Sequence, residues 1–185
     1  MQLTVEKTSI EGLVILAGEV FRDSRGFFAE SYHKEHFRDH GLDYEFVQEN
    51  HSRSSYKVLR GFHYQDMRAP MGKLVRCTAG AILDVAVDLR LNSPTLGQWL
   101  GVQLSADNMK QFMVPVGFGH AFVTLTDFAE VQYKCTGYYD SSAEGNIAWN
   151  DPSIGVEWPF EDPLLSDRDK KGKSLEEYLA RPAFT

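Results

Sequence analysis

Apolar and polar residues alternate with a period of two along most of the chain. This alternation is typical of β-strands with one buried face, because successive side chains of a strand point to opposite sides of the sheet. Turn-forming residues interrupt it at short intervals, as in DMRAPMG, RLNSPTLG and SADN. The pattern predicts strands at residues 26–32, 46–52, 57–65, 73–80, 81–90, 98–104, 110–117, 121–126 and 130–139.

Helical periodicity is limited to residues 33–41 and 173–180. Many short strands with few helices favour an all-β antiparallel sandwich or barrel. We expect a cupin-type jelly roll with a few short peripheral helices, because barrels of this type enclose a ligand cavity. The chain has 185 residues and no internal repeat or low-complexity linker, so residues 1–185 are expected to form a single domain.

The parity of side chains on the predicted strands separates a chemically active face from an apolar one. In LRGFHYQ, His63 and Gln65 share one face, and Phe62 and Tyr64 share the other. Further polar side chains are grouped in the same way on their own strands: Lys73, Asp84, Asp88, Tyr133 and Tyr139. This arrangement predicts a cavity lined by polar groups rather than a uniformly packed interior.

The acidic composition narrows the classes of partner. The formal net charge is −7, which argues against general nucleic-acid binding, since that needs a basic surface. A few converging Arg and Lys side chains can still bind one anionic ligand. No apolar run approaches the ~20 residues that span a bilayer. The first residues lack the pattern of a signal peptide, so we expect a cytoplasmic protein that binds neither nucleic acid nor membrane.

Three roles are open for His63. A metal site of the usual jelly-roll type needs a second histidine two residues on, where this chain has Gln65, whose amide is a poor ligand for transition metals. His120 alone leaves the set short of three protein ligands, so no metal site is predicted. A purely structural histidine is the common alternative, but the glycines beside His63 and His120 leave open space, as a cavity wall requires.

Proton transfer is the third role for His63. An imidazole is a natural general base for a C–H group next to a carbonyl. Lys73 could stabilise the developing enolate, and the phenol of Tyr133 could return a proton from the other side. A carboxylate should hold the imidazole in its working tautomer. Spacing alone leaves the choice open among Asp84, Asp88, Asp151 and Asp169.

Two arginines suggest contact with a phosphate. Arg25 and Arg60 each stand beside a glycine, which suits bidentate binding. A surface salt bridge is the commoner use of an arginine. The arginines alone therefore do not decide between these uses.

Ordered motifs over nearly the whole chain carry a family resemblance. They are FRDSRGFFAESY, FVQENHSRSS, VLRGFHYQ, GKLVRC, DVAVDLRLNSPTLGQW, VPVGFGHAF, YKCTGYY, WNDPSIGVEWP and LLSDRD. In these motifs the chain resembles the dTDP-4-dehydrorhamnose 3,5-epimerase family, dimeric cupin-fold isomerases that use no metal or organic cofactor. The resemblance implies a homodimer in which both subunits contribute to the nucleotide site of a dTDP-4-dehydro-6-deoxy-sugar.

The resemblance also implies roles for single residues. His63 would remove the sugar protons with Asp169 as its carboxylate partner, Lys73 would stabilise the enolate, and Tyr133 would donate a proton from the other face. The implied substrate-binding residues are Arg25 and Glu30, which would reach across the dimer interface, and Gln48, Glu49, Asn50, Arg60, His120, Tyr139, Glu144 and Arg168. Strand parity puts Arg60 opposite His63, so its ligand contact requires a bulge or an intersubunit role.

The implied activity is epimerisation at C3 and C5 of dTDP-4-dehydro-6-deoxy-D-glucose to dTDP-4-dehydro-L-rhamnose, in dTDP-L-rhamnose biosynthesis. Relatives that epimerise only C3 or only C5 share the same His, Lys and Tyr, so a mono-epimerase stays open. Two other classes are a non-catalytic sugar-nucleotide-binding cupin and a metal-dependent cupin oxygenase.

Overall fold

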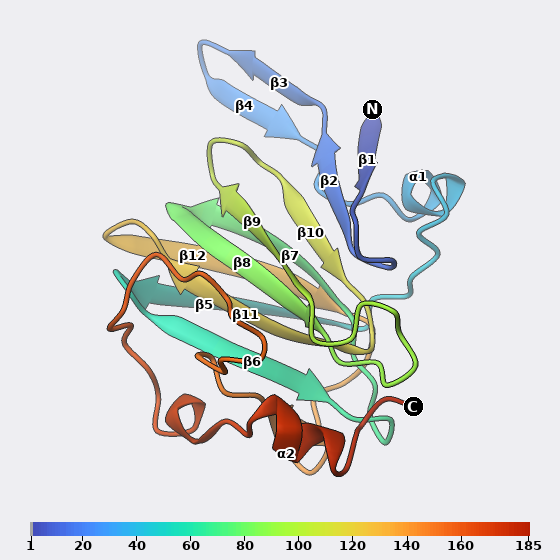
Figure 1. The fold of residues 1–185 in the computed structure, drawn as a ribbon. Helices are drawn as coiled ribbons and strands as arrows, with labels where there is room; N and C mark the ends of the chain where they lie inside the picture. The colour runs from blue at the N-terminus through green and yellow to red at the C-terminus, as the bar shows by residue number, and fades with distance from the viewer. Residues whose placement is uncertain (1) are drawn as a thin grey trace.

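The structure, a computed structural model, describes residues 2–185 as two antiparallel sheets packed into a β-sandwich (Figure 1). The larger sheet has the strand order β1 (Leu3–Lys7), β2 (Val14–Gly18), β10 (Gln111–Val114), β7 (Lys73–Ala79), β12 (Phe128–Cys135) and β5 (Gln48–Ser55). The smaller sheet has the order β13 (Glu144–Asn146), β6 (Leu59–Gln65), β11 (Phe118–Thr124), β8 (Ala81–Asp88) and β9 (Trp99–Ser105). The prediction of an all-β sandwich is confirmed.

A separate hairpin and short helices complete the fold. Strands β3 (Val20–Asp23) and β4 (Gly26–Ala29) form a two-stranded ribbon that projects from the sandwich, at the end opposite α2 (Figure 1). The helical elements are α1 (Lys34–Asp39), the 3₁₀ turn η1 (Asp169–Lys171) and α2 (Leu175–Leu179). Within residues 2–185, no helix combines the length and apolar character that crossing a membrane requires.

The main core lies between the two sheets. Val75 and Val131 from the larger sheet are fully buried against Ile82 and Ala86 from the smaller one. These residues occupy alternate positions of their strands, so the period-two pattern places them together on the inner face. Burial of this apolar surface is the main force that holds the sheets together.

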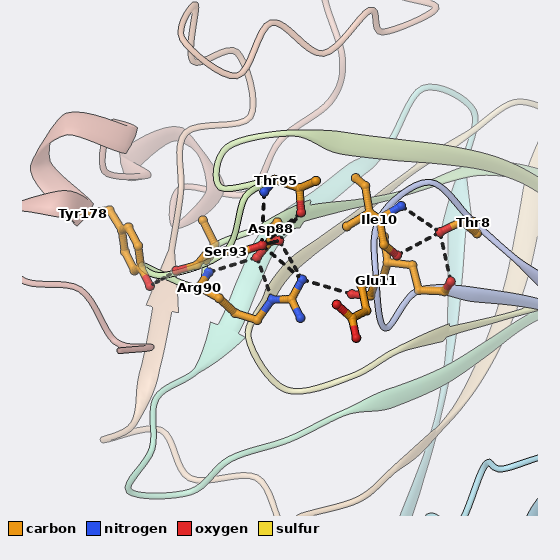
Figure 2. Close-up of polar contacts among 10 residues, drawn as sticks. Thr8, Ile10, Glu11, Asp88, Arg90, Ser93, Thr95 and Tyr178 are labelled. Carbon is orange, nitrogen blue, oxygen red and sulfur yellow. Dashed lines mark hydrogen bonds and ion pairs between the residues drawn. The ribbon is translucent and has the colours of Figure 1, made fainter.

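The outer face of the smaller sheet is also apolar and is covered by the C-terminal segment. Val85 and Val87 pack there with Phe62, and Leu175 and Tyr178 of the α2 region lie over them. The Tyr178 hydroxyl donates a hydrogen bond to the Leu89 carbonyl at 2.7 Å (Figure 2). This cover brings residues 166–178 back against β6 and β13, where they can complete a site.

Asp88, one of the open carboxylates, is a structural anchor at the end of β8. Its Oδ2 accepts hydrogen bonds from Arg90 Nη2 at 2.7 Å, Ser93 Oγ at 2.6 Å and Thr95 Oγ1 at 2.7 Å (Figure 2). Burial alone would raise the pKa of Asp88, but these donors hold it below its ordinary value. Arg90 also donates to the Glu11 carbonyl at 3.0 Å, which ties the N-terminal loop to this network.

The strands predicted from alternation all form, with small shifts at their ends, whereas β1, β2, β3 and β13 were not predicted. Most of β1 is solvent-exposed, and β13 reads EGN with no apolar residue, so neither shows the alternation of a half-buried strand. The two predicted helices are shorter than expected. The second begins after Ser174, whose hydroxyl accepts from the Glu177 amide at 3.1 Å while the Ser174 amide donates to the Glu177 carboxylate at 2.8 Å.

Candidate active site

A cavity of about 230 Å³ opens between the two sheets. Strands of both sheets and three segments outside the strands supply its walls, and its lining residues include Asn50, His63, Gln65, Met71, Lys73, Tyr133, Tyr139, Glu144 and Arg168. The predicted cavity with polar walls is therefore present. Its opposite walls belong to different sheets, since His63 lies on β6 and Tyr133 on β12.

A register change in β6 determines which side chains face this cavity. His63 pairs with His120 across β11, but Arg60 pairs with Phe122, so three steps along β6 match two along β11. The extra residue forms a bulge and brings Arg60 to the same face as His63. Arg60 Nε donates to Ser54 Oγ at 3.0 Å, across to the other sheet. The bulge required by strand parity is thus observed.

Gly61 occupies this bulge for a steric reason. Its φ is +128°, a backbone conformation that disfavours side chains. A Cβ at this position would lie 2.4 Å from the Ala121 Cβ and 2.6 Å from the His120 carbonyl oxygen. The close approach of β6 to β11 therefore requires glycine.

His63 is paired with Asp169 from η1. Its Nε2 lies 2.5 Å from Asp169 Oδ1, and the second oxygen, Oδ2, accepts from Ser166 Oγ at 2.7 Å. Asp169 is only 3% exposed. Burial would raise the pKa of Asp169, but the hydrogen bonds from His63 and Ser166 hold it below its ordinary value. Asp169 can therefore orient the imidazole as a carboxylate.

The other open carboxylates have different partners. Asp84 Oδ1 lies 2.9 Å from His120 Nε2, and both side chains are buried. Asp151 accepts hydrogen bonds from the backbone amides of Ser153 and Leu175. With Asp88 held by Arg90, the structure pairs only Asp169 with His63 among these carboxylates.

The imidazole of His63 is held in its neutral form. Burial lowers its pKa most, and repulsion from the nearby charges of Lys73 and Arg168 lowers it further, against the opposing effect of Asp169. Besides Asp169, the ring meets Arg168, whose Nη2 lies 3.0 Å from His63 Nδ1 and 2.6 Å from His63 Nε2. Arg168 Nη1 donates to Glu144 Oε2 at 2.7 Å.

Lys73 and Tyr133 form the wall across from His63. The ammonium of Lys73 lies 5.8 Å from the centre of the Tyr133 ring. Burial lowers the pKa of Lys73, and the negative charges of Asp84 and Glu144 partly oppose this effect. Burial raises the pKa of Tyr133, so its phenol keeps its proton at neutral pH. The wall therefore presents the Lys73 amino group, whose charged form Asp84 and Glu144 favour, and a neutral proton donor.

Polar side chains at the mouth of the cavity are linked to one another. Gln48 Nε2 donates to Asn50 Oδ1 at 3.1 Å, and the Tyr139 amide donates to Gln48 Oε1 at 3.1 Å. The Tyr139 hydroxyl donates to Glu144 Oε2 at 3.4 Å. These links connect β5 to the loop after β12 and hold the mouth in shape.

Comparison with known proteins identifies the family. A family model described as dTDP-4-dehydrorhamnose 3,5-epimerase matches residues 7–177. The chain belongs to the dTDP-4-dehydrorhamnose 3,5-epimerase family. A curated dTDP-4-dehydrorhamnose 3,5-epimerase of Salmonella typhimurium is 51% identical over 179 residues, which cover 96% of this chain and 98% of that protein. The predicted resemblance is confirmed.

Two further relatives bear on fold and specificity. A crystal structure of the dTDP-6-deoxy-D-glucose-3,5-epimerase of Legionella pneumophila, in complex with dTDP-4-keto-L-rhamnose, superposes with a TM-score of 0.91 at 44% identity. The match covers 95% of this chain and 94% of that one. A dTDP-4-dehydrorhamnose 3-epimerase of Streptomyces niveus is 37% identical over 169 residues, 91% of this chain and 82% of that protein. Double and single epimerases thus share this sequence pattern.

Some residues implied by the epimerase resemblance lie away from the cavity of this chain. Arg25 is held by Asp23 at 2.6 Å on the exposed hairpin, and Glu30 lies 3.0 Å from His36. Glu49 accepts from Lys134 Nζ at 3.1 Å. None of the three lines the cavity in residues 2–185.

Two residues that support the site were not predicted. Ser166 fixes Asp169, and its only signal in the sequence is its position three residues before Asp169. Gln65 uses both ends of its amide to hold the cavity mouth. Its Nε2 donates to the Ala69 carbonyl at 2.7 Å, and its Oε1 accepts from the Asp140 amide at 2.7 Å. The structure therefore gives Gln65 a definite task beside His63.

Proposed function

We propose that the protein epimerises C3 and C5 of dTDP-4-dehydro-6-deoxy-D-glucose to give dTDP-4-dehydro-L-rhamnose, in dTDP-L-rhamnose biosynthesis. The observation that carries this proposal is the His63–Asp169 pair facing Lys73 and Tyr133 across one cavity. Membership of the epimerase family supports the substrate, since relatives at about half identity carry this name.

The reaction follows from the positions of these groups. Neutral His63 removes the proton next to the C4 ketone, while Asp169 stabilises the imidazolium that forms. The Lys73 ammonium stabilises negative charge on the enolate oxygen. Tyr133 returns a proton from the opposite wall, which inverts the carbon. Proton exchange with solvent then returns His63 to its neutral form and Tyr133 to its protonated form, and the same steps at the second carbon complete the double epimerisation, with no cofactor.

We infer that the working unit is a homodimer. Arg25 lies on a hairpin that projects from the sandwich, and Phe27 and Phe28 beside it are 58% and 65% exposed. A second copy of the chain is a fitting partner for these aromatic side chains, since association buries such surface. The hairpin of one protomer would then add Arg25 and Glu30 to the nucleotide site of its partner.

Proton exchange in deuterated water tests the function. Purified protein is incubated with dTDP-4-dehydro-6-deoxy-D-glucose, and deuterium at C3 and C5 is measured by proton NMR. We expect incorporation at both carbons, and none with His63→Ala. Exchange at one carbon alone would favour the mono-epimerase, for which the Streptomyces niveus 3-epimerase is the model. Binding of dTDP without any exchange would indicate a non-catalytic sugar-nucleotide-binding protein.

A further inference from the structure

Two side-chain amides of β5 lie beside the proposed proton donor. Gln48 and Asn50 occupy alternate positions of the strand and therefore point to the same face of the sheet. Tyr133 is the direct partner of Asn50 across β5 and β12, and both residues line the active-site cavity. Directly opposed residues on neighbouring strands have Cβ atoms about 4.5–5.5 Å apart. The Asn50 amide is therefore within reach of the Tyr133 side chain.

The backbone amide of Tyr139 determines which way these side-chain amides point. A backbone N–H can only donate, so the oxygen of Gln48 must face it, as observed at 3.1 Å. The nitrogen of Gln48 is then directed at Asn50, where it donates to Oδ1 at 3.1 Å. With its oxygen engaged, Asn50 presents Nδ2 to the buried Cys135 sulfur at 3.7 Å. Asn50 is consequently held as a hydrogen-bond donor toward the inner face of β12.

This orientation bears on the phenol of Tyr133, which gives up its proton in the proposed reaction. Burial raises the pKa of Tyr133 most, and the Asn50 side chain opposes burial by lowering that pKa. A hydrogen-bond donor stabilises the charged form of a phenol, whereas an acceptor stabilises the neutral form. The direction of the Asn50 effect thus agrees with a donor at Nδ2. The ionisable groups that face Tyr133 are Lys73 on β7, Cys135 on β12, His63 and Arg60 on β6, and Arg168 before η1.

We propose that Asn50 is a positioning residue for Tyr133, with its Nδ2 held toward the phenol oxygen by Gln48. The proposal rests on the proposed function, because it assigns Asn50 to the proton donor of that reaction. In the donating step the phenol O–H bond breaks, the C–H bond of the inverted carbon forms, and the electron pair of the O–H bond stays on the phenolate. An N–H group directed at this oxygen stabilises the phenolate and makes the phenol a stronger acid.

The pKa of residue 133 is measured first, on the full chain without substrate, so the result does not depend on the epimerase function. Difluorotyrosine is incorporated at position 133, because its more acidic phenol titrates at a pH where the fold is stable, and fluorine NMR follows its ionisation. The variants are Asn50→Ala, Asn50→Asp and Gln48→Met. The matched control is Ser52→Ala, because Ser52 lies on the same face of β5 and its hydroxyl has no hydrogen-bond partner among residues 2–185.

We expect the pKa of residue 133 to rise in the three variants, since each removes or misdirects the N–H donor, and to stay unchanged in Ser52→Ala. Looser packing alone would admit water and lower this pKa, so the sign separates positioning from a structural effect. An unchanged or lower pKa in Asn50→Ala and Gln48→Met would overturn the proposal.

Kinetics provide the second measurement, with tyrosine at position 133 and saturating substrate. Asn50→Ala should slow net epimerisation by about 10–100-fold, the factor that corresponds to one hydrogen bond to a charged group. It should slow deuterium exchange much less, because exchange needs only His63. Equal loss of both rates would also overturn the proposal. If the wild type exchanges no protons, the proposed function fails, while the pKa comparison still decides whether Asn50 donates to Tyr133.

Discussion

Replacement of Gly61 tests the link between the β6 bulge and the active site. Gly26 supplies a matched control, because it has the same φ of +128°, but a Cβ there would meet nothing within 4 Å among the described residues. Gly61→Ala and Gly26→Ala therefore share the backbone strain and differ in the contact with Ala121 and His120. The comparison isolates the packing of the bulge.

The expected loss of stability is the sum of backbone strain and steric overpacking. A side chain in this backbone conformation costs about 1–3 kcal/mol at either position. The 2.4 Å approach to Ala121 adds overpacking, which typically costs about 1–3 kcal/mol more. At roughly 2–4 °C per kcal/mol for a chain of this size, Gly61→Ala should melt about 2–12 °C below Gly26→Ala.

Calorimetry at one fixed protein concentration measures this difference, since the Tm of a homodimer depends on concentration. Well below the Tm and at saturating substrate, Gly61→Ala should also slow deuterium exchange, because a shift of β6 moves His63. Equal melting temperatures for the two variants would show that β11 accommodates the added methyl group, and the steric account of the bulge would be refuted.

Three other results are expected for the proposed reaction. The positive charge of Arg168 helps to lower the pKa of His63, so Arg168→Ala should raise that pKa and move the acidic limb of kcat/KM to higher pH. Arg168→Lys keeps the charge and should leave the limb in place; a shift in both variants would exclude a charge effect. Tyr133→Phe should slow net epimerisation much more than deuterium exchange, as measured by NMR, because exchange needs only the base; equal loss would contradict the donor role. Removal of metal ions with EDTA should leave kcat unchanged, and a loss restored by added metal would contradict the cofactor-free reaction.

Most strands could be predicted from the sequence, whereas the arrangement of the candidate site residues could not. Alternation of apolar residues predicted β6 to β12 because each of these strands contributes buried side chains to a core. The partner of His63 could not be chosen by spacing, since Asp169 lies 106 residues further on and reaches it only through the C-terminal cover of the smaller sheet. Parity misplaced Arg60 because one extra residue in β6 reverses the alternation. Both features depend on tertiary packing, which cannot be inferred from the local alternation of apolar and polar residues.

Two neighbouring histidines of the smaller sheet are each paired with a carboxylate, but they differ in their access to the cavity. His63 and His120 are direct partners across β6 and β11, and each imidazole faces a carboxylate. Only His63 lines the cavity, with 20% of its side chain exposed, whereas the side chain of His120 is 7% exposed and Asp84 is fully buried. The charge of Asp84 instead favours the ammonium form of Lys73 against its burial. In the proposed reaction, the inner pair would favour the charged form of Lys73 that stabilises the enolate, and the outer pair would remove the proton that creates it.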